Sequence, residues 1–559
     1  MAPRIESEGF LVILFDFIKQ HPLGSMYALV GLVMVLIIYS VYRYALPRVD
    51  SREPPLVNPR IPLIGHNIAL IRDGPGAWLK IHKKRSLPIV TLPVLGGTGK
   101  IYMTTSPSLI TAMFASPTLQ FTPLLTPIVK PFVQLGPQQA RDFESGMLLG
   151  WVHSLPRMLS SGGAGREVTA AALEDLRKQI GGAVGETQVG RGEIEVADIG
   201  MWIRDVVSRA LIKGLIGNVP WAEDKTFIQA FWDLEWELDH FLTSPIPAWT
   251  VPRAFKARTH VLDVLEAWFT STTPTTTTHS EGFGPGVLSP VAVKLLSAAD
   301  PLTHWTPRDR ATLLLFLIHV ALSNVVQTTW WFFAHVYSDA KLVAALQDEV
   351  KDALAATNTT DTTANALVDL TQSTSQSCPL LRASLLETQR VVTSTPIVRS
   401  VTADTIISDG KGGREYLLEK GAFVLAPRTI VHNDAKHWGE DAEEFQPERF
   451  LPRQPAAAAA TTTTCTVVGN GANAEKGRDG VVRGTFIPFG GGREICPGRY
   501  VATSTVLAMV AMLLTTVDIK TRRDAPVKVP GPGKLQLTTV VWRIPRETSW
   551  RGSIQSRRG

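Results

Sequence analysis

The sequence predicts a mainly α-helical protein with small β-sheets, of the α+β class, joined to a membrane by a single N-terminal transmembrane helix. Helical spacing of apolar residues dominates a chain of 559 residues, 45% of them apolar. Short β-branched runs between residues 88 and 103 are interrupted by a pair of glycines, which indicates a small hairpin. Residues 23–42 carry no formal charge and have about the length that a bilayer core requires.

The order of segments predicts four parts. They are a lumenal or interfacial segment over residues 1–22, a transmembrane anchor over 23–42, a proline-rich hinge over 43–62 and the main body over 63–559. The apolar run is long for a cleaved signal peptide, and no small-residue cleavage site follows it. Arg43, Arg48 and Arg52 follow the run, whereas Lys19 lies directly before it, so the positive-inside rule places the body in the cytosol.

Cysteine usage and net charge limit the possible classes. Cys378, Cys465 and Cys496 show no close pairing and cannot form a four-cysteine zinc site, which favours a reducing compartment. A net charge of +6 over this length is compatible with an acidic redox partner or an anionic membrane surface, but it is not a nucleic-acid signal. His432 and His437 lie in a polar stretch and are a weak indication of metal binding.

The most informative stretch is residues 489–498, F-G-G-G-R-E-I-C-P-G, which contains Cys496. A thiolate that ligates iron needs a favourable local field, nearby backbone N–H donors and protection from solvent. Consecutive glycines allow close approach to a large planar ligand, and Pro497 suits the first position of an apolar helix over 500–517. The alternatives are a packed, inert cysteine in a turn, as in a non-catalytic membrane scaffold, or a cysteine nucleophile of a hydrolase with the glycines as its oxyanion site.

F-x-x-G followed by C-P-G-R resembles the haem-binding loop of the cytochrome P450 family, which makes Cys496 the proximal ligand of a haem b iron. The resemblance implies the cytochrome P450 fold for residues 63–559 and cofactor contacts from Phe489, Gly490, Gly492 and Arg493. The family pattern F-x-x-G-x-R-x-C-x-G has arginine where Glu494 stands, and Arg493 is one position early. Members of the sterol 7α-hydroxylase and prostacyclin synthase type, and many fungal members, also lack that arginine, so the chain is similar to a fungal microsomal type.

Residues 311–337 predict a long, mostly apolar helix in which polar groups mark the crossing of a cavity. The segment is similar to the family's central helix over the haem. Many monooxygenases of the family have an acid followed by an alcohol there, whereas this chain has Asn324 followed by Val325. An amide orients water but does not relay a proton, so Asn324 is the candidate catalytic residue, acting through ordered water. The alternative role is a buried amide bonded within its own helix.

Three charged residues match a structural network of the family. Glu387 and Arg390 are three apart on a predicted helix and share a face. They fit the motif E-x-x-R, and Arg449 fits P-E-R-F, so the resemblance implies a buried Glu-Arg-Arg network beside the haem. Arg399 stands where the family places an arginine that binds a haem propionate, and arginine suits a carboxylate bidentately. An exposed surface position is the alternative for Arg399.

Two biased segments carry no predicted chemistry. Residues 455–484 contain alanine and threonine runs and predict a disordered surface insertion, and the threonine-rich stretch 357–377 predicts a solvated loop.

The resemblance implies a monooxygenase that oxidises a lipophilic small molecule with dioxygen and electrons from NADPH through the NADPH-cytochrome reductase. The predicted location is the endoplasmic reticulum membrane, with one span and a cytosolic catalytic domain. An apolar cavity lining, listed as Ala321, Asn324, Val325, Pro396, Ile397 and Val398, favours a terpenoid or steroid-like substrate in fungal secondary-metabolite biosynthesis. Two alternatives remain: a haem-thiolate isomerase that rearranges a lipid peroxide without external electrons, and a sterol hydroxylase of primary metabolism.

Overall fold

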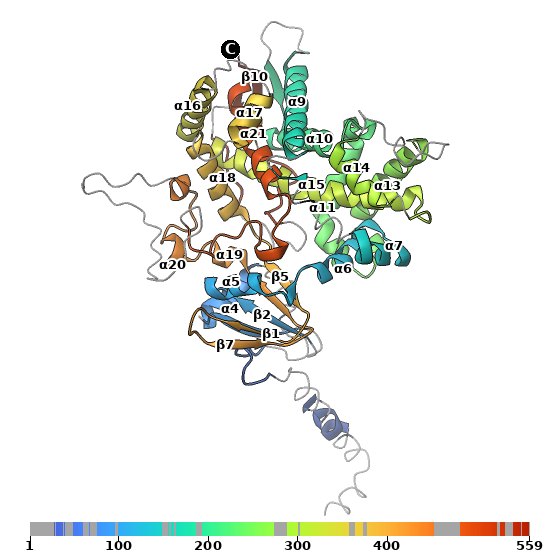
Figure 1. The fold of residues 1–559 in the computed structure, drawn as a ribbon, viewed down its shortest axis with the longest axis vertical. Helices are drawn as coiled ribbons and strands as arrows, with labels where there is room; N and C mark the ends of the chain where they lie inside the picture. Colours follow the sequence, from blue (N-terminus) through green and yellow to red (C-terminus); the bar gives the residue numbers. More distant parts are fainter. Residues whose placement is uncertain are drawn as a thin grey trace, which may run out of the picture.

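The structure is a computed structural model, and a helical region and a smaller sheet-rich region make up the part of the chain that it describes (Figure 1). The described residues are 27, 30–36, 38–39, 49–59, 66, 75–85, 87–94, 99–147, 155, 158–160, 164–185, 193–272, 288–299, 302–356, 364–372, 377–451, 481–521, 526–531, 540–548 and 550–557.

Helices form most of the described chain. They are α4 (Pro75–Arg85), α5 (Pro107–Ala115), α6 (Thr122–Val133), α7 (Pro137–Asp142), α9 (Ala164–Gly185), α10 (Ile199–Leu215), α11 (Lys225–Thr243), α12 (Pro247–Thr250), α13 (Pro252–Thr272), α14 (Pro290–Leu296), α15 (Pro307–Tyr337), α16 (Ala340–Ala356), α17 (Ala364–Gln372), α18 (Pro379–Val392), α19 (Arg428–Val431), α20 (Ala435–Trp438) and α21 (Arg499–Thr516).

The described strands form three small sheets. The largest has the order β1-β2-β8-β5-β3, with β1 (Ile89–Pro93), β2 (Lys100–Thr104), β8 (Phe423–Ala426), β5 (Ile397–Val401) and β3 (Leu119–Gln120). A second sheet joins β4 (Glu193–Val196), β10 (Gly552–Ser556) and β9 (Val517–Thr521), and a third pairs β6 (Thr405–Ser408) with β7 (Glu415–Leu418). The predicted hairpin is confirmed, because β1 pairs antiparallel with β2 in the register Ile89 to Thr104.

Part of the proline-rich hinge lies along the edge of the largest sheet. The N–H of Val57 donates to the Thr91 carbonyl at 2.9 Å, and the N–H of Thr91 donates to the Pro55 carbonyl at 2.9 Å. Proline has no N–H to contribute to an inner strand, so an edge position suits this segment.

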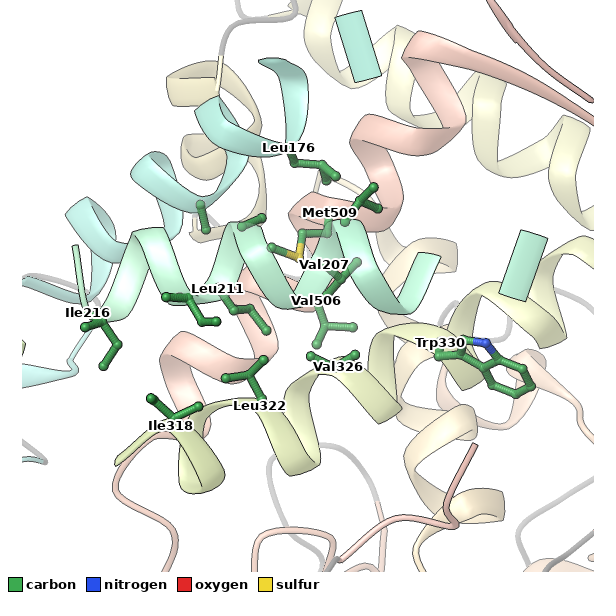
Figure 2. Packing of buried hydrophobic residues seen from close by; sticks show 14 of the residues in the cluster. Leu176, Val207, Leu211, Ile216, Ile318, Leu322, Val326, Trp330, Val506 and Met509 are labelled. Carbon is green, nitrogen blue, oxygen red and sulfur yellow. The ribbon is translucent and has the colours of Figure 1, made fainter. Parts of the chain in front are cut away.

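Helix α15 runs through the core. Its N-terminus has a capping box in which the Thr306 hydroxyl and the Asp309 carboxylate satisfy each other's backbone N–H groups. Apolar side chains of α9, α10, α15 and α21 meet around it (Figure 2), among them Leu176, Val207, Leu211, Leu322, Val326, Val506 and Met509. Two described helices, α15 and α21, are long and apolar enough to cross a membrane, but 67% and 61% of their most apolar windows are buried inside the protein. They are therefore core helices of the body.

The structure differs from the sequence prediction at three places. Helix α21 begins at Arg499, so Pro497 lies in the turn before it. Helix α17 forms inside the threonine-rich stretch 357–377, because Leu367 and Val368 bury an apolar face completely. Val481 is 7% exposed and packs with Trp438 and Ala442, so the packed body resumes before residue 484. The rest of the predicted insertion lies outside the described residues, as do residues 40–48 and most of 1–39.

Candidate active site

The loop around Cys496 depends on glycine at two positions. Gly490 and Gly492 have φ of +75° and +71°, a region that side chains with a Cβ rarely adopt. A Cβ on Gly491 would overlap the ring of Phe114, and one on Gly492 would overlap its carbonyl oxygen, whereas nothing lies within 4 Å of a Cβ position on Gly490. The loop thus packs against α5 on one side and leaves open space at Gly490.

The environment of the Cys496 thiol is set by opposing effects. Burial is the largest effect and raises the pKa of the thiol overall, although the backbone N–H groups of Gly498 and Arg499 and the guanidinium groups of Arg499 and Arg428 oppose it. The N–H of Cys496 donates to the Phe489 carbonyl at 3.0 Å and closes the loop. A soft ligand held close to the N-terminus of α21, with two amides directed at its sulfur, has the properties of a metal-binding thiolate.

Two buried side chains fix the start of this loop at Ile487. His432 Nε2 accepts from the Ile487 N–H at 3.0 Å, and its Nδ1 donates to the Arg390 carbonyl at 3.1 Å. Arg428 Nε donates to the Ile487 carbonyl at 3.1 Å, and its Nη1 donates to the Thr395 carbonyl at 2.9 Å. Burial lowers the pKa of His432 to about 3 and that of Arg428 to about 9.

This placement corrects the metal interpretation of His432. The side chain is fully buried and both of its ring nitrogens are used in hydrogen bonds. No group of three or more potential metal-binding side chains occurs among the described residues.

Glu494 connects the loop to helix α6 and to Arg399. Its carboxylate accepts from the Phe121 N–H at 2.5 Å, the Thr122 N–H at 3.0 Å and the Thr122 hydroxyl at 2.8 Å. Arg399 Nε lies 3.2 Å from Glu494 Oε2, with the two side chains 6% and 19% exposed. Burial lowers the pKa of Arg399 and the Glu494 carboxylate opposes that effect. The acid in the position of the family's arginine thus caps a helix and pairs with an arginine.

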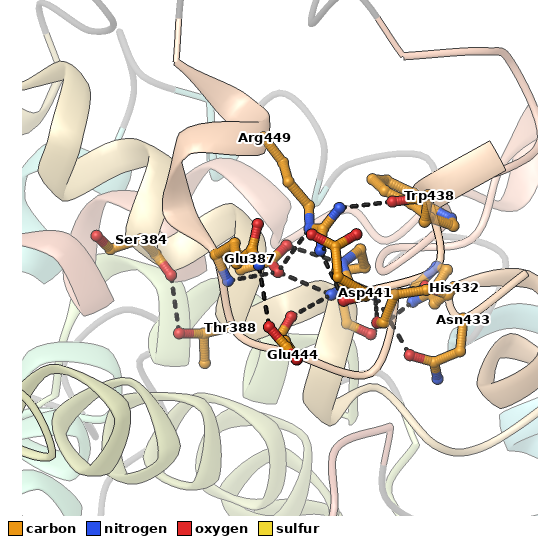
Figure 3. A network of polar contacts seen from close by, with 12 residues as sticks. Ser384, Glu387, Thr388, His432, Asn433, Trp438, Asp441, Glu444 and Arg449 are labelled. Atoms are coloured by element: carbon orange, nitrogen blue, oxygen red, sulfur yellow. Dashed lines mark hydrogen bonds and ion pairs between the residues drawn. The ribbon is translucent and has the colours of Figure 1, made fainter. Parts of the chain in front are cut away.

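Glu387, Arg390 and Arg449 come together in one buried network (Figure 3). Arg390 makes two bonds of 2.7 Å to the Glu387 carboxylate, and Arg449 Nε lies 3.3 Å from Glu387 Oε1. Arg390 also donates to the carbonyl oxygens of His432, Ala442 and Glu444. All three side chains are 2% exposed or less, so each charge depends on the others.

One face in the middle of α15 is open, although most of this helix is buried. Val320 is 52% exposed, and Phe316, Ala321, Asn324 and Val325 are half-buried on the same side. These positions recur at three and four residues, which is one face of a helix. This face of α15 is therefore less covered by neighbouring elements than the rest of the helix.

Asn324 makes a contact that the sequence did not predict. Its Oδ1 accepts from the Val540 N–H at 2.8 Å. Gln327 Oε1 accepts from the Ile544 N–H at 3.1 Å, and Trp331 Nε1 donates to the Trp542 carbonyl at 2.6 Å. The backbone of every second residue from Val540 to Ile544 is therefore bonded to α15. Asn324 links α15 to this segment.

The other predicted site residues are dispersed. Phe489 is half-buried and Arg493 is exposed in the short turn Gly492–Glu494. Ile397 is 3% exposed in an apolar cluster of the largest sheet, so it does not line an open cavity as expected. The sequence analysis missed Arg428 and Phe114 as loop supports. An arginine within the apolar run 422–431 was the available signal for Arg428.

Comparisons with known proteins agree with this site. The cytochrome P450 family model matches residues 312–541, which include most of α15, the Glu387 network and the Cys496 loop. A cytochrome P450 monooxygenase of Gibberella zeae is 26% identical over 498 residues, 88% of this chain and 86% of the relative. Cytochrome P450 monooxygenase nodJ of Hypoxylon pulicicidum is 23% identical over 84% of each chain. The 25-hydroxycholesterol 7-alpha-hydroxylase of Rattus norvegicus is 26% identical over 38% of this chain and 47% of its own.

A cysteine in a glycine-rich loop, the network behind it and these matches define the class of haem-thiolate proteins. The chain belongs to the cytochrome P450 family. It is a monooxygenase of that family, an oxidoreductase that incorporates oxygen from dioxygen. The family implies haem with iron on a cysteine thiolate, and the residues present fit that group: Cys496 is the thiol, Gly490 faces open space and α15 presents an apolar wall.

Proposed function

We propose that the chain is a membrane-anchored monooxygenase that hydroxylates or otherwise oxidises a terpenoid or steroid-like molecule in fungal secondary metabolism. The proposal rests on one observation above all, the open apolar face of α15 that contains the half-exposed Val320. Such a wall suits a rigid hydrocarbon with few polar groups better than a charged metabolite. Bound haem b supplies the activation of dioxygen, and the electrons come from NADPH through the NADPH-cytochrome reductase.

The chain's own residues have separate roles in this proposal. Cys496 provides the thiolate, with the amides of Gly498 and Arg499 stabilising its charge. Arg399 lies beside the loop, where it binds either Glu494 or a propionate, and Phe489, Gly490, Gly492 and Arg493 shape the cofactor side of the loop. Asn324 orients water from α15 while its Oδ1 stays bonded to Val540.

The relatives favour the same substrate class. The relatives from Gibberella zeae and Hypoxylon pulicicidum are monooxygenases of fungi, and the rat relative acts, by its name, on a hydroxylated cholesterol. The substrate in the rat relative's name and the apolar face of α15 both support a steroid-like or terpenoid skeleton.

Turnover in the presence and absence of electrons tests the reaction type. The chain is incubated in microsomes with a panel of terpenoids and steroids, with NADPH and reductase added or omitted. We expect oxygenated product only when both are present. Product formed equally well without them contradicts the proposal and favours an isomerase that rearranges a lipid peroxide.

Membrane attachment through residues 23–42 has its own support. The described residues of this segment, 27, 30–36 and 38–39, are helical, and Leu32, Val35 and Ile38 are 56%, 60% and 60% exposed. Burying such apolar surface in lipid contributes about 25 cal/mol per Å². In sealed microsomes, added protease should digest the region after residue 54. Protection of that region contradicts a cytosolic body.

A further inference from the structure

His319 and Glu235 form a pair where helices α6, α11 and α15 converge. His319 Nδ1 on α15 lies 2.5 Å from Glu235 Oε1 on α11. The imidazole also packs against Phe132 of α6, with ring centroids 4.7 Å apart and planes tilted by 60°. Three helices thus fix the ring, which lowers the conformational freedom that the side chain loses when it binds a ligand.

The pair lies at the edge of the open face of α15. Val320, the next residue, is 52% exposed, and Phe316 and Asn324 are half-buried on the turns before and after it. The His319 side chain is itself 13% exposed, whereas the Glu235 side chain is 2% exposed. The imidazole is therefore the more exposed member of the pair and the one that a ligand on this face of α15 can reach.

One hydrogen-bonding atom of the pair has no partner among the described residues. Glu235 Oε2 is fully buried without a partner, and the hydrogen bond between the His319 ring and Glu235 is made by Nδ1, which leaves Nε2. A buried polar atom without a partner costs free energy of folding, so native proteins rarely keep one without a use.

We propose that the Glu235–His319 pair binds a hydroxyl group of the substrate. The Glu235 carboxylate accepts the Nδ1 proton, so Nε2 is the ring nitrogen left for the ligand. A hydroxyl both donates and accepts hydrogen bonds, so it can bond to Nε2 whether or not this nitrogen carries a proton. This inference rests on the proposed function above and narrows its substrate to an alcohol of a terpenoid or steroid-like hydrocarbon.

The pair also assigns a place in a reaction sequence. A substrate that already contains a hydroxyl must come from a step that installs one, by an earlier oxygenation or by hydrolysis of an ester or diphosphate. When the substrate lacks the hydroxyl, polar groups of the site stay unpaired. Such a site rejects the analogue without the hydroxyl more strongly than an apolar pocket rejects an added methylene group.

Spectral titration of the whole membrane-bound protein tests the proposal. Ligand displacement of the haem's distal water is followed for matched pairs with and without one hydroxyl: 5α-androstan-3β-ol against 5α-androstane, and a diterpene alcohol against its parent hydrocarbon. His319→Phe keeps a ring against Phe132 but removes both nitrogens, and Glu235→Gln removes the carboxylate charge. His304→Phe is the control, because His304 pairs with Asp142 at 2.7 Å on a surface where it is 44% exposed.

We expect at least one alcohol to bind about tenfold more tightly than its hydrocarbon partner, and this ratio to fall to about one in His319→Phe. Glu235→Gln should lower the ratio in part, and His304→Phe should leave it unchanged. Equal binding of both partners, a ratio that survives in His319→Phe, or no binding of any compound to a protein with an intact carbon-monoxide spectrum overturns the inference. Loss of the carbon-monoxide spectrum in the unmodified protein instead contradicts the proposed function.

Discussion

Glu494 has a role that the family's arginine cannot perform. Its carboxylate satisfies two backbone N–H groups at the start of α6 and neutralises Arg399. The N-terminus of a helix favours negative charge, so an acid is well suited to this position. The departure from the family pattern is therefore compensated within the loop's own surroundings.

Replacing Glu494 by alanine should lower the free energy of unfolding by about 2–4 kcal/mol. The loss combines unsatisfied N–H groups with a buried guanidinium that has lost its charged partner. Chemical denaturation measures it, and Arg493→Ala is the control because the neighbouring Arg493 is exposed. A cost below about 0.5 kcal/mol for Glu494→Ala, equal to that of the control, contradicts the assigned role.

The hydrogen bond from Val540 requires an acceptor oxygen on the side chain at position 324, but it does not require an amide nitrogen there. Asn324→Asp keeps an oxygen for the Val540 N–H and should remain within about 0.5 kcal/mol of the unmodified chain. Asn324→Ala should cost about 1 kcal/mol and loosen residues 540–544. Hydrogen exchange at Val540 reports the difference. Unchanged protection of Val540 in Asn324→Ala would show that the bond contributes nothing.

At the scale of elements, α18 is joined to the 432–449 segment by charge rather than by apolar packing alone. Arg390 bonds to Glu387 and to three backbone carbonyl oxygens, all from atoms with no access to water. Buried charges are stable only as a complete set, so removal of one member affects the whole network.

Arg390→Ala should destabilise the protein by about 3–5 kcal/mol and lower the yield of haem-containing protein. Arg253→Ala is the matched control, because Arg253 bonds to Asp233 at 2.7 Å but is 59% exposed. An exposed pair contributes no more than about 1 kcal/mol. Equal unfolding midpoints for the two variants would exclude the buried network as a stabilising element.

The segment from α19 to the Cys496 loop should be sensitive to acid through His432. Burial, together with Arg428 and Arg390, lowers its pKa to about 3, below the 6.5 of the unfolded chain. The unfolded state therefore binds more protons than the folded state between these values, so stability falls as pH falls from 6.5 towards 3.

Below pH 6, protonation of this histidine in the unfolded chain should lower the unfolding free energy by about 1.4 kcal/mol per pH unit. Most carboxylates titrate at lower pH, so they contribute little to this slope. His335, with its pKa lowered to about 4, adds a similar slope. Denaturation in detergent at pH 6.5, 6 and 5 measures the slope, and His432→Asn should reduce it by about 1.4 kcal/mol per unit. An identical slope in the variant contradicts neutral burial of His432.

The sequence was most informative where spacing and apolar periodicity act together. The helices around Asn324 and Glu387 and the hairpin at β1 and β2 were predicted within a few residues, because each has a continuous pattern. Helix α17 was missed because its threonine-rich flanks hide the short apolar stripe at Leu367 and Val368. The backbone N–H groups bonded to Asn324 and Glu494 lie 216 and 372–373 residues away, and local pattern carries no information about such pairings.

The whole molecule is organised so that distant segments support one loop. Helix α5 contacts its glycines, α6 is bonded to its Glu494, and His432 and Arg428 fix its start at Ile487. Helix α15 presents its less covered face in the middle of the body, and α21 begins three residues after the cysteine. We therefore expect the activity to depend on one residue of this loop, Cys496.

The carbon-monoxide spectrum of the reduced protein tests this claim most directly, in membranes that contain either the unmodified chain or Cys496→Ser. The unmodified chain should give the red-shifted Soret band of a thiolate-ligated haem, and Cys496→Ser should lose it at equal expression because serine supplies no thiolate. Cys378→Ser, which changes a buried cysteine on another element, should leave the band unchanged. An undiminished red-shifted band in Cys496→Ser, or its absence from the unmodified chain, would contradict the account.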